Sequence, residues 1–188
     1  MNTSIQTPQE GDLEFLNPYK VESESFSLSS DVQVSIQKYF LDFKEWKGEP
    51  IPNTYNGKAV IDWNGEPVFA ELAVLRLFQS HGWEGVWVDS YRRKYRTGLP
   101  DVTEPVEIPE KQKQLIESIR AKTGRSGGCW DVFVWKGDKA FFIELKRQKR
   151  DAIKESQIDW LRVCLENGLN TANFALIEWK CPNLLYMC

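Results

Sequence analysis

The chain has 188 residues and a formal net charge of −3, which is enough length for one domain with a sizeable hydrophobic core. No apolar run approaches the roughly 20 residues of a membrane span, and the start of the chain lacks the pattern of a secretory signal. A single histidine and four cysteines, none in a Cys-x-x-Cys pair, argue against a structural zinc site and a disulfide framework. These features favour a reducing, intracellular location, either cytoplasmic or with the nucleoid or nucleus.

The first part of the chain is acidic. Residues 1–35 hold six acidic residues and one lysine, a net charge of −5, so the remaining chain carries +2 of the total of −3. Their Ser- and Thr-rich, weakly periodic sequence predicts a flexible tail. Residues 36–66 are predicted to be an extension that packs on the following domain. The pattern of residues 31–46 is ambiguous, because it fits either a strand or a helix. Residues 59–63 are predicted to form a short strand, which ends at the turn signal Asn64-Gly65.

Residues 67–188 are predicted to form one α/β domain. Its expected elements are a helix over 67–80, a strand over 85–90, a basic insert over about 91–127 containing a helix at 110–123, a hairpin of two strands within 131–146, a helix over 155–167 and a strand over 174–179. A hairpin at the centre, followed by a helix that crosses over to the last strand, predicts a mixed central sheet flanked by helices.

The central hairpin carries the strongest functional signal. A turn centred on Gly137-Asp138 places Asp131 directly opposite Glu144, about 5 Å apart at Cβ, where like charges are destabilising. A divalent cation is the economical way to offset that repulsion. Lys146 lies two residues beyond Glu144 and therefore projects from the same face. Two acids and a lysine on one face are the groups needed to cut a phosphodiester with water and a metal ion.

Each candidate also has an ordinary structural explanation. Asp131 can cap a turn, Glu144 can pair with a neighbouring basic residue, and Lys146 can be an exposed lysine at a strand end. Glu71 points inward with the apolar face of its helix, although an acid in a first helical turn is also favoured by the macrodipole. Gln157 shares a helix face with apolar residues and points at the sheet, which also suits a residue at the edge of the core.

Basic and aromatic residues near the hairpin suggest a surface for a polyanion. Clustered arginine and lysine side chains can bind phosphates, and tyrosines between them can stack on bases. The alternative is a solvated basic loop. The candidate nucleic-acid-binding residues are Tyr91, Arg92, Arg93, Lys94, Arg96, Arg147, Lys149 and Arg150.

Together these motifs resemble the PD-(D/E)XK nuclease superfamily. The matching stretches are Gly128-Cys129-Trp130-Asp131 and Ile143-Glu144-Leu145-Lys146, and the downstream Gln157 with the helix-borne Glu71 resemble the VRR-NUC branch, which is related to Holliday-junction resolvases. The resemblance covers about residues 67–179, and Trp130 stands where the family usually has proline. It implies a restriction-endonuclease-like, three-layer α/β/α core.

The resemblance also implies roles for these residues. Mg²⁺ or Mn²⁺ would be held by Asp131, Glu144 and the backbone carbonyl of Leu145, with Glu71 binding through water or a second metal ion. Lys146 would orient or deprotonate the attacking water and stabilise the charge that develops on the phosphate. Gln157 would position the lysine or the phosphate.

The sequence therefore predicts a Mg²⁺-dependent endodeoxyribonuclease that hydrolyses phosphodiester bonds in DNA. The absence of a recognisable sequence-reading module suggests selectivity for branched or junction DNA, and the resemblance suggests a homodimer. Two alternatives stay open. One is an inactive nuclease-fold module that binds nucleic acid or a protein partner. The other is a nuclease subunit that needs a protein partner docked on residues 1–66.

Overall fold

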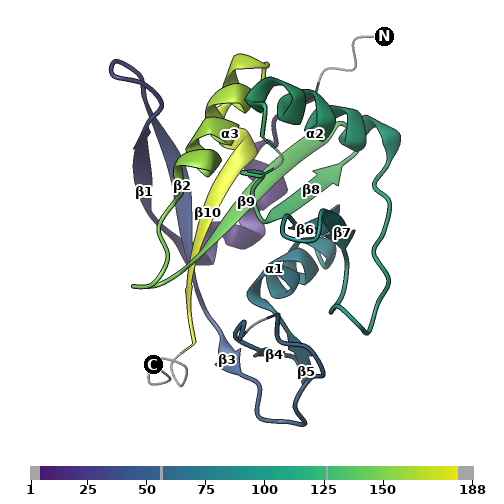
Figure 1. The fold of residues 1–188 in the computed structure, drawn as a ribbon. Helices are drawn as coiled ribbons and strands as arrows, with labels where there is room; N and C mark the ends of the chain where they lie inside the picture. Colours follow the sequence, from purple (N-terminus) through teal and green to yellow (C-terminus); the bar gives the residue numbers. More distant parts are fainter. Residues whose placement is uncertain (1–4, 56, 126, 182–188) are drawn as a thin grey trace.

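The computed structural model describes residues 5–55, 57–125 and 127–181, and within them seven strands form one mixed sheet (Figure 1). The strands are β1 (Lys20–Ser27), β2 (Gln33–Asp42), β6 (Glu84–Asp89), β7 (Lys94–Arg96), β8 (Val132–Lys136), β9 (Lys139–Arg147) and β10 (Phe174–Lys180). Their order across the sheet is β1-β2-β10-β9-β8-β6-β7. Strand β10 runs parallel to both β2 and β9, and the other neighbours are antiparallel. The predicted mixed sheet is confirmed.

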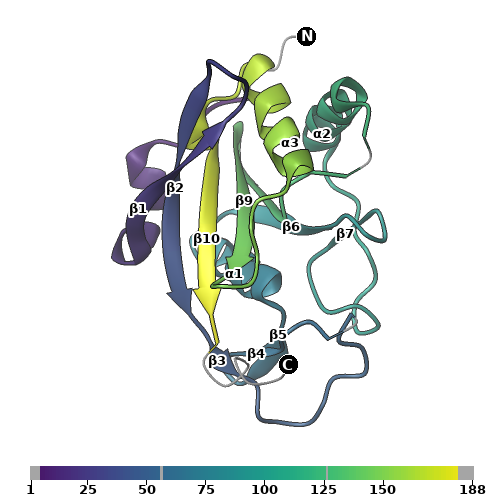
Figure 2. The same ribbon diagram turned by 60° about the vertical axis from the view of Figure 1, so that its left-hand side comes forward.

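Helices cover both faces of this sheet. They are α1 (Ala70–Gln79), α2 (Glu110–Thr123) and α3 (Glu155–Glu166), together with the 3₁₀ helices η1 (Glu10–Tyr19) and η2 (Thr171–Asn173). Figures 1 and 2 show α2 and α3 side by side over one face, whereas α1 and η1 pack on the other. None of the helices in the described residues combines the length and the apolar character needed to cross a bilayer.

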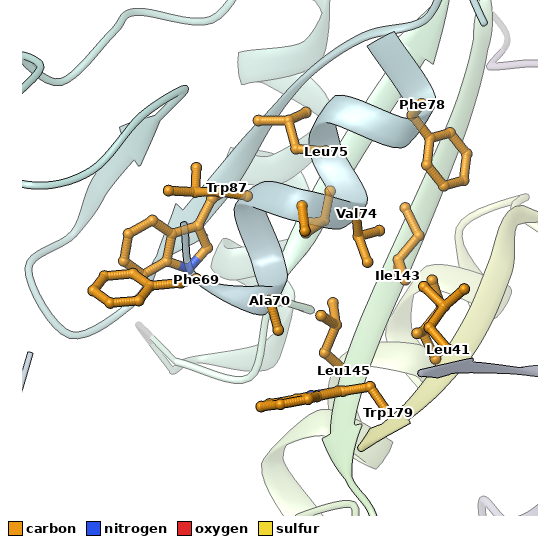
Figure 3. Close-up of a cluster of buried hydrophobic side chains, with 14 of the residues drawn as sticks. Leu41, Phe69, Ala70, Val74, Leu75, Phe78, Trp87, Ile143, Leu145 and Trp179 are labelled. Atoms are coloured by element: carbon orange, nitrogen blue, oxygen red, sulfur yellow. The ribbon is translucent and has the colours of Figure 1, made fainter. Parts of the chain in front are cut away.

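Alternating side chains of the central strands build two separate hydrophobic cores. On the α1 face, Val134, Ile143 and Ile177 pack with the apolar residues of α1. Figure 3 shows Ile143 within this cluster. On the α2–α3 face, Phe133 and Phe142 stack with their ring centroids 4.5 Å apart. Strands covered on both faces are expected to be apolar throughout, which is the pattern from which the hairpin was predicted.

The register of the central hairpin agrees with the prediction. Lys136 is opposite Lys139, Trp135 opposite Ala140 and Phe133 opposite Phe142. Gly137 adopts a positive φ of 58°, which glycine accepts without steric cost and which allows a two-residue turn. One step beyond the last pair, Val132 with Ile143, this register puts Asp131 opposite Glu144.

A second, three-stranded sheet lies beside α1 at one end of the molecule (Figure 1). It consists of β3 (Lys44–Glu45), β4 (Ile61–Trp63) and β5 (Glu66–Val68), in the order β3-β4-β5. The predicted turn is confirmed, because Asn64 and Gly65 have φ values of 53° and 87°. The predicted start of the first helix is wrong. Pro67 belongs to edge strand β5, where proline is tolerated, and the helix begins at Ala70.

The prediction of a flexible tail over residues 1–35 is also wrong for the described residues. Residues 10–27 form η1 and strand β1, and Leu16 is completely buried against the α1 core. Strand β1 is the edge of the sheet, and most of its side chains are exposed. An edge strand with one packed side chain, here Phe26, needs few apolar residues, so its composition resembles that of a tail. Of the residues left ambiguous, 33–42 form strand β2.

Candidate active site at the ends of the central strands

The predicted acids and lysine meet where β8 begins and β9 ends. Glu144 is 1% exposed, and Lys146 Nζ donates to its Oε1 at 2.8 Å. Asp131 is partly buried, and its Oδ2 accepts a hydrogen bond of 3.0 Å from the Leu145 backbone N–H. In an extended strand the carbonyl of a residue points toward the same neighbour as its N–H. The Leu145 carbonyl therefore faces the Asp131 side of β9, as the prediction requires.

Gln157 reaches this pair from the first turn of α3. Its Nε2 donates to Glu144 Oε1 at 2.5 Å, and its Oε1 accepts from Lys146 Nζ at 3.0 Å. The same Oε1 accepts from the backbone N–H of Lys154, the N-cap of α3, at 3.0 Å, so the start of the helix fixes the amide. Gln157 thus holds the lysine and the glutamate in one arrangement, and the prediction that it faces the sheet is confirmed.

Glu71 approaches Asp131 from the opposite face of the sheet. It lies in the first turn of α1 and is 8% exposed. Its Oε1 is paired with Lys58 Nζ, and its charge is one of the causes that raise the pKa of Asp131. Asp131 precedes β8, at the point where the sheet ends, so groups from both faces of the sheet act on it. The structure therefore brings together all the predicted catalytic residues, Glu71, Asp131, Glu144, Lys146 and Gln157.

Burial and mutual repulsion disfavour the charged forms of the two central acids. Burial raises the pKa of Glu144 well above its ordinary value, and the adjacent Asp131 carboxyl raises it further, while Lys146 opposes this. Burial also raises the pKa of Asp131, followed by the charge of Glu71, against the hydrogen bond from Leu145. Raised pKa values of this kind show that nearby positive charge does not fully compensate the negative charge of the buried acids. Such shifts concentrate at functional sites.

The donor set fits a hard divalent cation. Glu144 Oε2 is buried and has no hydrogen-bond partner, although buried polar atoms are normally paired. Mg²⁺ and Mn²⁺ accept carboxylate and carbonyl oxygens and retain several waters, so two acids and one carbonyl suffice. Among the described residues no group of three or more His, Cys, Asp or Glu side chains is arranged to hold a metal ion. Any cation here therefore depends on Asp131, Glu144 and the backbone.

Cys129 makes no alternative site. It is buried two residues before Asp131, and burial raises the pKa of its thiol to about 12. The thiol therefore stays protonated at neutral pH, whereas metal ligation and nucleophilic attack need the thiolate.

The predicted nucleic-acid-binding residues differ in their exposure to solvent. Tyr91 is 84% exposed, and Arg92, Arg93, Lys94, Lys149 and Arg150 are exposed as well. Arg147 is partly buried, with its guanidinium 5.6 Å from the centre of the Trp179 ring. The prediction that Arg96 binds nucleic acid is wrong. It is buried and its Nε is 2.9 Å from Asp89 Oδ2, because strand β7 pairs with β6 and turns this side chain toward the acid. Arg96 cannot belong to an exposed phosphate-binding surface.

Lys58, Tyr55 and Asp89 were not among the site residues predicted from the sequence. Lys58 reaches Glu71, and Tyr55 Oη donates to Asp89 Oδ2 at 2.5 Å. Asp89 lies within the predicted strand 85–90 and is the last residue of β6, and an acid at the end of a buried strand is a usable signal. Lys58 and Tyr55 come from a loop rich in proline and glycine, and no periodicity there points to a site.

A pocket of about 290 Å³ lies beside Glu71, the acid that α1 contributes to the site. Its lining includes Lys58 and Glu71 from one side and Leu145, Arg147 and Trp179 from the strand ends.

No family model matches the chain, and searches of curated proteins and of solved structures likewise find no match.

Proposed function

We propose that the protein is a divalent-metal-dependent nuclease that hydrolyses phosphodiester bonds in DNA. The observation that carries the proposal is the state of Glu144. One of its oxygens is held by Lys146 and Gln157, and the other is buried with no partner, beside a second acid. Burying such a cluster of negative charge costs free energy, and a bound cation would supply the positive charge that the cluster lacks.

The arrangement of elements supports a restriction-endonuclease-like core, as the resemblance implies. In chain order the core consists of α1, β6, β8, β9, α3 and β10. Strands β6, β8 and β9 form an antiparallel meander, and α3 crosses over to β10, which runs parallel to β9. The acids and the lysine lie at the strand ends, where side chains from both faces converge.

The residues of the site can perform three tasks. Asp131, Glu144 and the Leu145 carbonyl would hold Mg²⁺ or Mn²⁺, which when bound lowers the pKa of a coordinated water and neutralises developing charge. Lys146, fixed by Gln157 and Glu144, would orient the attacking water and stabilise charge on the phosphate. Glu71 would hold a further water of the site.

Exposed basic residues on two sides of the site support a polyanionic substrate. Arg92, Arg93 and Lys94 extend from the end of β6, and Lys149 and Arg150 follow β9. No sequence-reading module accompanies them, so we propose that branched or junction DNA is recognised by shape, with the protein acting as a homodimer.

The test compares Glu144→Gln with wild-type protein on junction, flap and linear duplex DNA, with Mg²⁺ present. Cleavage by Glu144→Gln should fall at least about 1,000-fold, because the amide removes a charge needed at the site. Glu84→Gln, an exposed change at the far end of the sheet, is the matched control and should cut normally. Wild-type rates from Glu144→Gln would end the proposal, and equal cutting of all three substrates would end its selectivity.

A non-catalytic module is the second candidate. Lys58 and Lys146 already offset part of the negative charge of the acids through ion pairs with Glu71 and Glu144. A fold that binds nucleic acid without cutting it requires such neutralisation by its own side chains. Calorimetry with Mn²⁺ separates the two candidates, because the module takes up no divalent cation at Asp131 and Glu144.

A further inference from the structure

Lys58 is a cation from outside the nuclease-like part of the chain, yet it is built into the acid cluster. Its Nζ pairs with Glu71 Oε1, and the two side chains are 35% and 11% exposed, respectively. The same ammonium lies over the rings of Trp87 and Phe69, at 5.4 and 5.9 Å from their centres. Burial alone would lower the pKa of Lys58, but Glu71, Asp131 and Asp89 together raise it. The ammonium is therefore paired with Glu71, and the charges of Asp131 and Asp89 add to its stabilisation.

Tyr55 anchors the backbone that carries this lysine. Its hydroxyl donates to Asp89 Oδ2, the oxygen that also accepts from Arg96 Nε. Its ring packs edge-on against Trp87, with centroids 5.6 Å apart, and lies under the Arg92 guanidinium at 4.4 Å. The Tyr55 side chain is therefore fixed through both its hydroxyl and its ring, and the backbone N–H of Lys58 donates to the Thr54 carbonyl at 2.7 Å.

The charges of the cluster balance only when ligands are added. Glu71, Asp131 and Glu144 supply three negative charges, and Lys58 and Lys146 supply two positive ones, leaving −1 when all are ionised. A divalent cation alone makes the total +1. One phosphodiester charge then returns it to zero. The cluster is therefore matched to the cation and the phosphate together. Because this count includes Lys58, the lysine stays near the site after the cation has replaced it beside Glu71.

We infer that Lys58 is a built-in counter-ion for Glu71 and Asp131, replaced in that role by a divalent cation and then available to a substrate phosphate in the adjoining pocket. The inference rests on the proposed function for the identity of these ligands. The pocket can take a phosphate, because its lining has three cations, Lys58, Arg147 and Arg150, against two acids, Glu71 and Asp151.

The first experiment measures Mn²⁺ and Ca²⁺ affinity by calorimetry on the full chain without DNA. Lys58→Met should bind the cation at least about 10-fold more tightly than wild type, because one charge beside an acid shifts its ion-binding equilibrium by that much or more. Lys122→Met, which removes an exposed lysine from α2, makes the same change in net charge and should alter the affinity less than about 2-fold. Equal effects of the two variants would overturn the inference.

Asp131→Asn separates this outcome from failure of the proposed function. If wild type binds no cation, or Asp131→Asn binds it as wild type does, the metal site itself is wrong. If Asp131→Asn loses binding while Lys58→Met binds as wild type does, only the role of Lys58 is wrong.

A double-mutant cycle provides a readout that does not depend on affinity. Urea unfolding of wild type, Lys58→Met, Glu71→Gln and the double variant is measured in chelator and in saturating Ca²⁺. The Lys58–Glu71 coupling should be present in chelator and largely lost with Ca²⁺. Equal coupling in both conditions would show that the pair merely fastens the loop to α1. If Lys58→Met does not fold, Lys58→Gln, which keeps a hydrogen-bond donor, replaces it.

The phosphate part of the inference is tested with a short DNA duplex in Ca²⁺. Lys58→Met should bind the duplex about 3- to 10-fold more weakly than wild type in Ca²⁺, because one phosphate contact is lost. In chelator, where Lys58 stays with Glu71, the two proteins should bind alike. Unchanged affinity in Ca²⁺ would remove the phosphate role.

Discussion

Glu144 shows how one side chain can be held in place and still lack a partner. Lys146 and Gln157 both bind Oε1, so the carboxyl group cannot rotate away, while Oε2 is buried without a partner and the charge of Asp131 acts on the same carboxyl group. Hydrogen bonds to charged groups stabilise by about 1.5–3 kcal/mol, which is less than the full cost of burying a carboxylate. The side chain is therefore positioned in advance for a ligand that the protein itself does not supply.

This arrangement predicts how stability depends on pH when divalent cations are chelated. Folding raises the pKa of Glu144 above its ordinary value of 4.5, so the folded state binds the proton more tightly than the unfolded chain. The contribution of Glu144 to stability is therefore present below pH 4.5 and is lost as the pH rises through the folded pKa. It amounts to about 1.4 kcal/mol for each unit by which folding raises the pKa.

Glu144→Gln lacks this titration, so it should become more stable relative to wild type as the pH rises above 4.5. Asp131 acts in the same direction from its ordinary value of 3.8. Urea unfolding at several pH values measures the difference between the two proteins. A difference that stays constant, or that moves toward wild type at higher pH, would contradict the prediction.

Individual site residues differ in how visible they are in the sequence. Asp131 and Glu144 could be paired because a two-residue turn and strand alternation determine which side chains are opposite. The contact between Lys58 and Glu71 could not be predicted, because it depends on how Tyr55 packs against β6 and β7. Arg96 reads as part of a basic run, and only its pairing with buried Asp89 shows otherwise.

At the scale of elements, patterns decided by neighbouring residues were predicted well. Helix α2 has the predicted bounds, since Pro109 precedes it and Gly124, with φ of 64°, ends it. Errors arose where distant packing decides the outcome. Strand β1 carries almost no apolar signal, and its place in the sheet comes from β2.

The residues just before β8 pack closely against the start of α3, and the site requires this contact. Gly128 has a φ of 97°, and a Cβ there would lie 2.3 Å from the Ser156 carbonyl oxygen. Gly128→Ala should therefore destabilise the protein by about 3 kcal/mol or more and shift Asp131 relative to Gln157. Gly124→Ala also has a positive φ but meets open space, so it should cost only about 1 kcal/mol. Thermal unfolding compares them, and equal losses would mean that the close approach is unimportant.

At the scale of the whole molecule, the N-terminal part completes the core. Leu16 is 0% exposed and packs in the same cluster as α1. Leu16→Ala should cost about 2–5 kcal/mol of unfolding free energy, as buried leucine truncations do. Leu13→Ala, at a partly buried position on the same helix, should cost less. Urea denaturation decides, because a loosely attached tail would leave both variants as stable as wild type.

The order of strands has a consequence for how the protein is made. Strand β2 lies between β1 and β10, so the hairpin of β1 and β2 attaches to the rest of the main sheet through β10, the last strand among the described residues. During translation, this hairpin leaves the ribosome early, whereas residues 174–180 leave near the end of the described chain. Tyr39 and Leu41, which pack in the α1 core, therefore reach their complete packing only after the central strands and β10 have been synthesised.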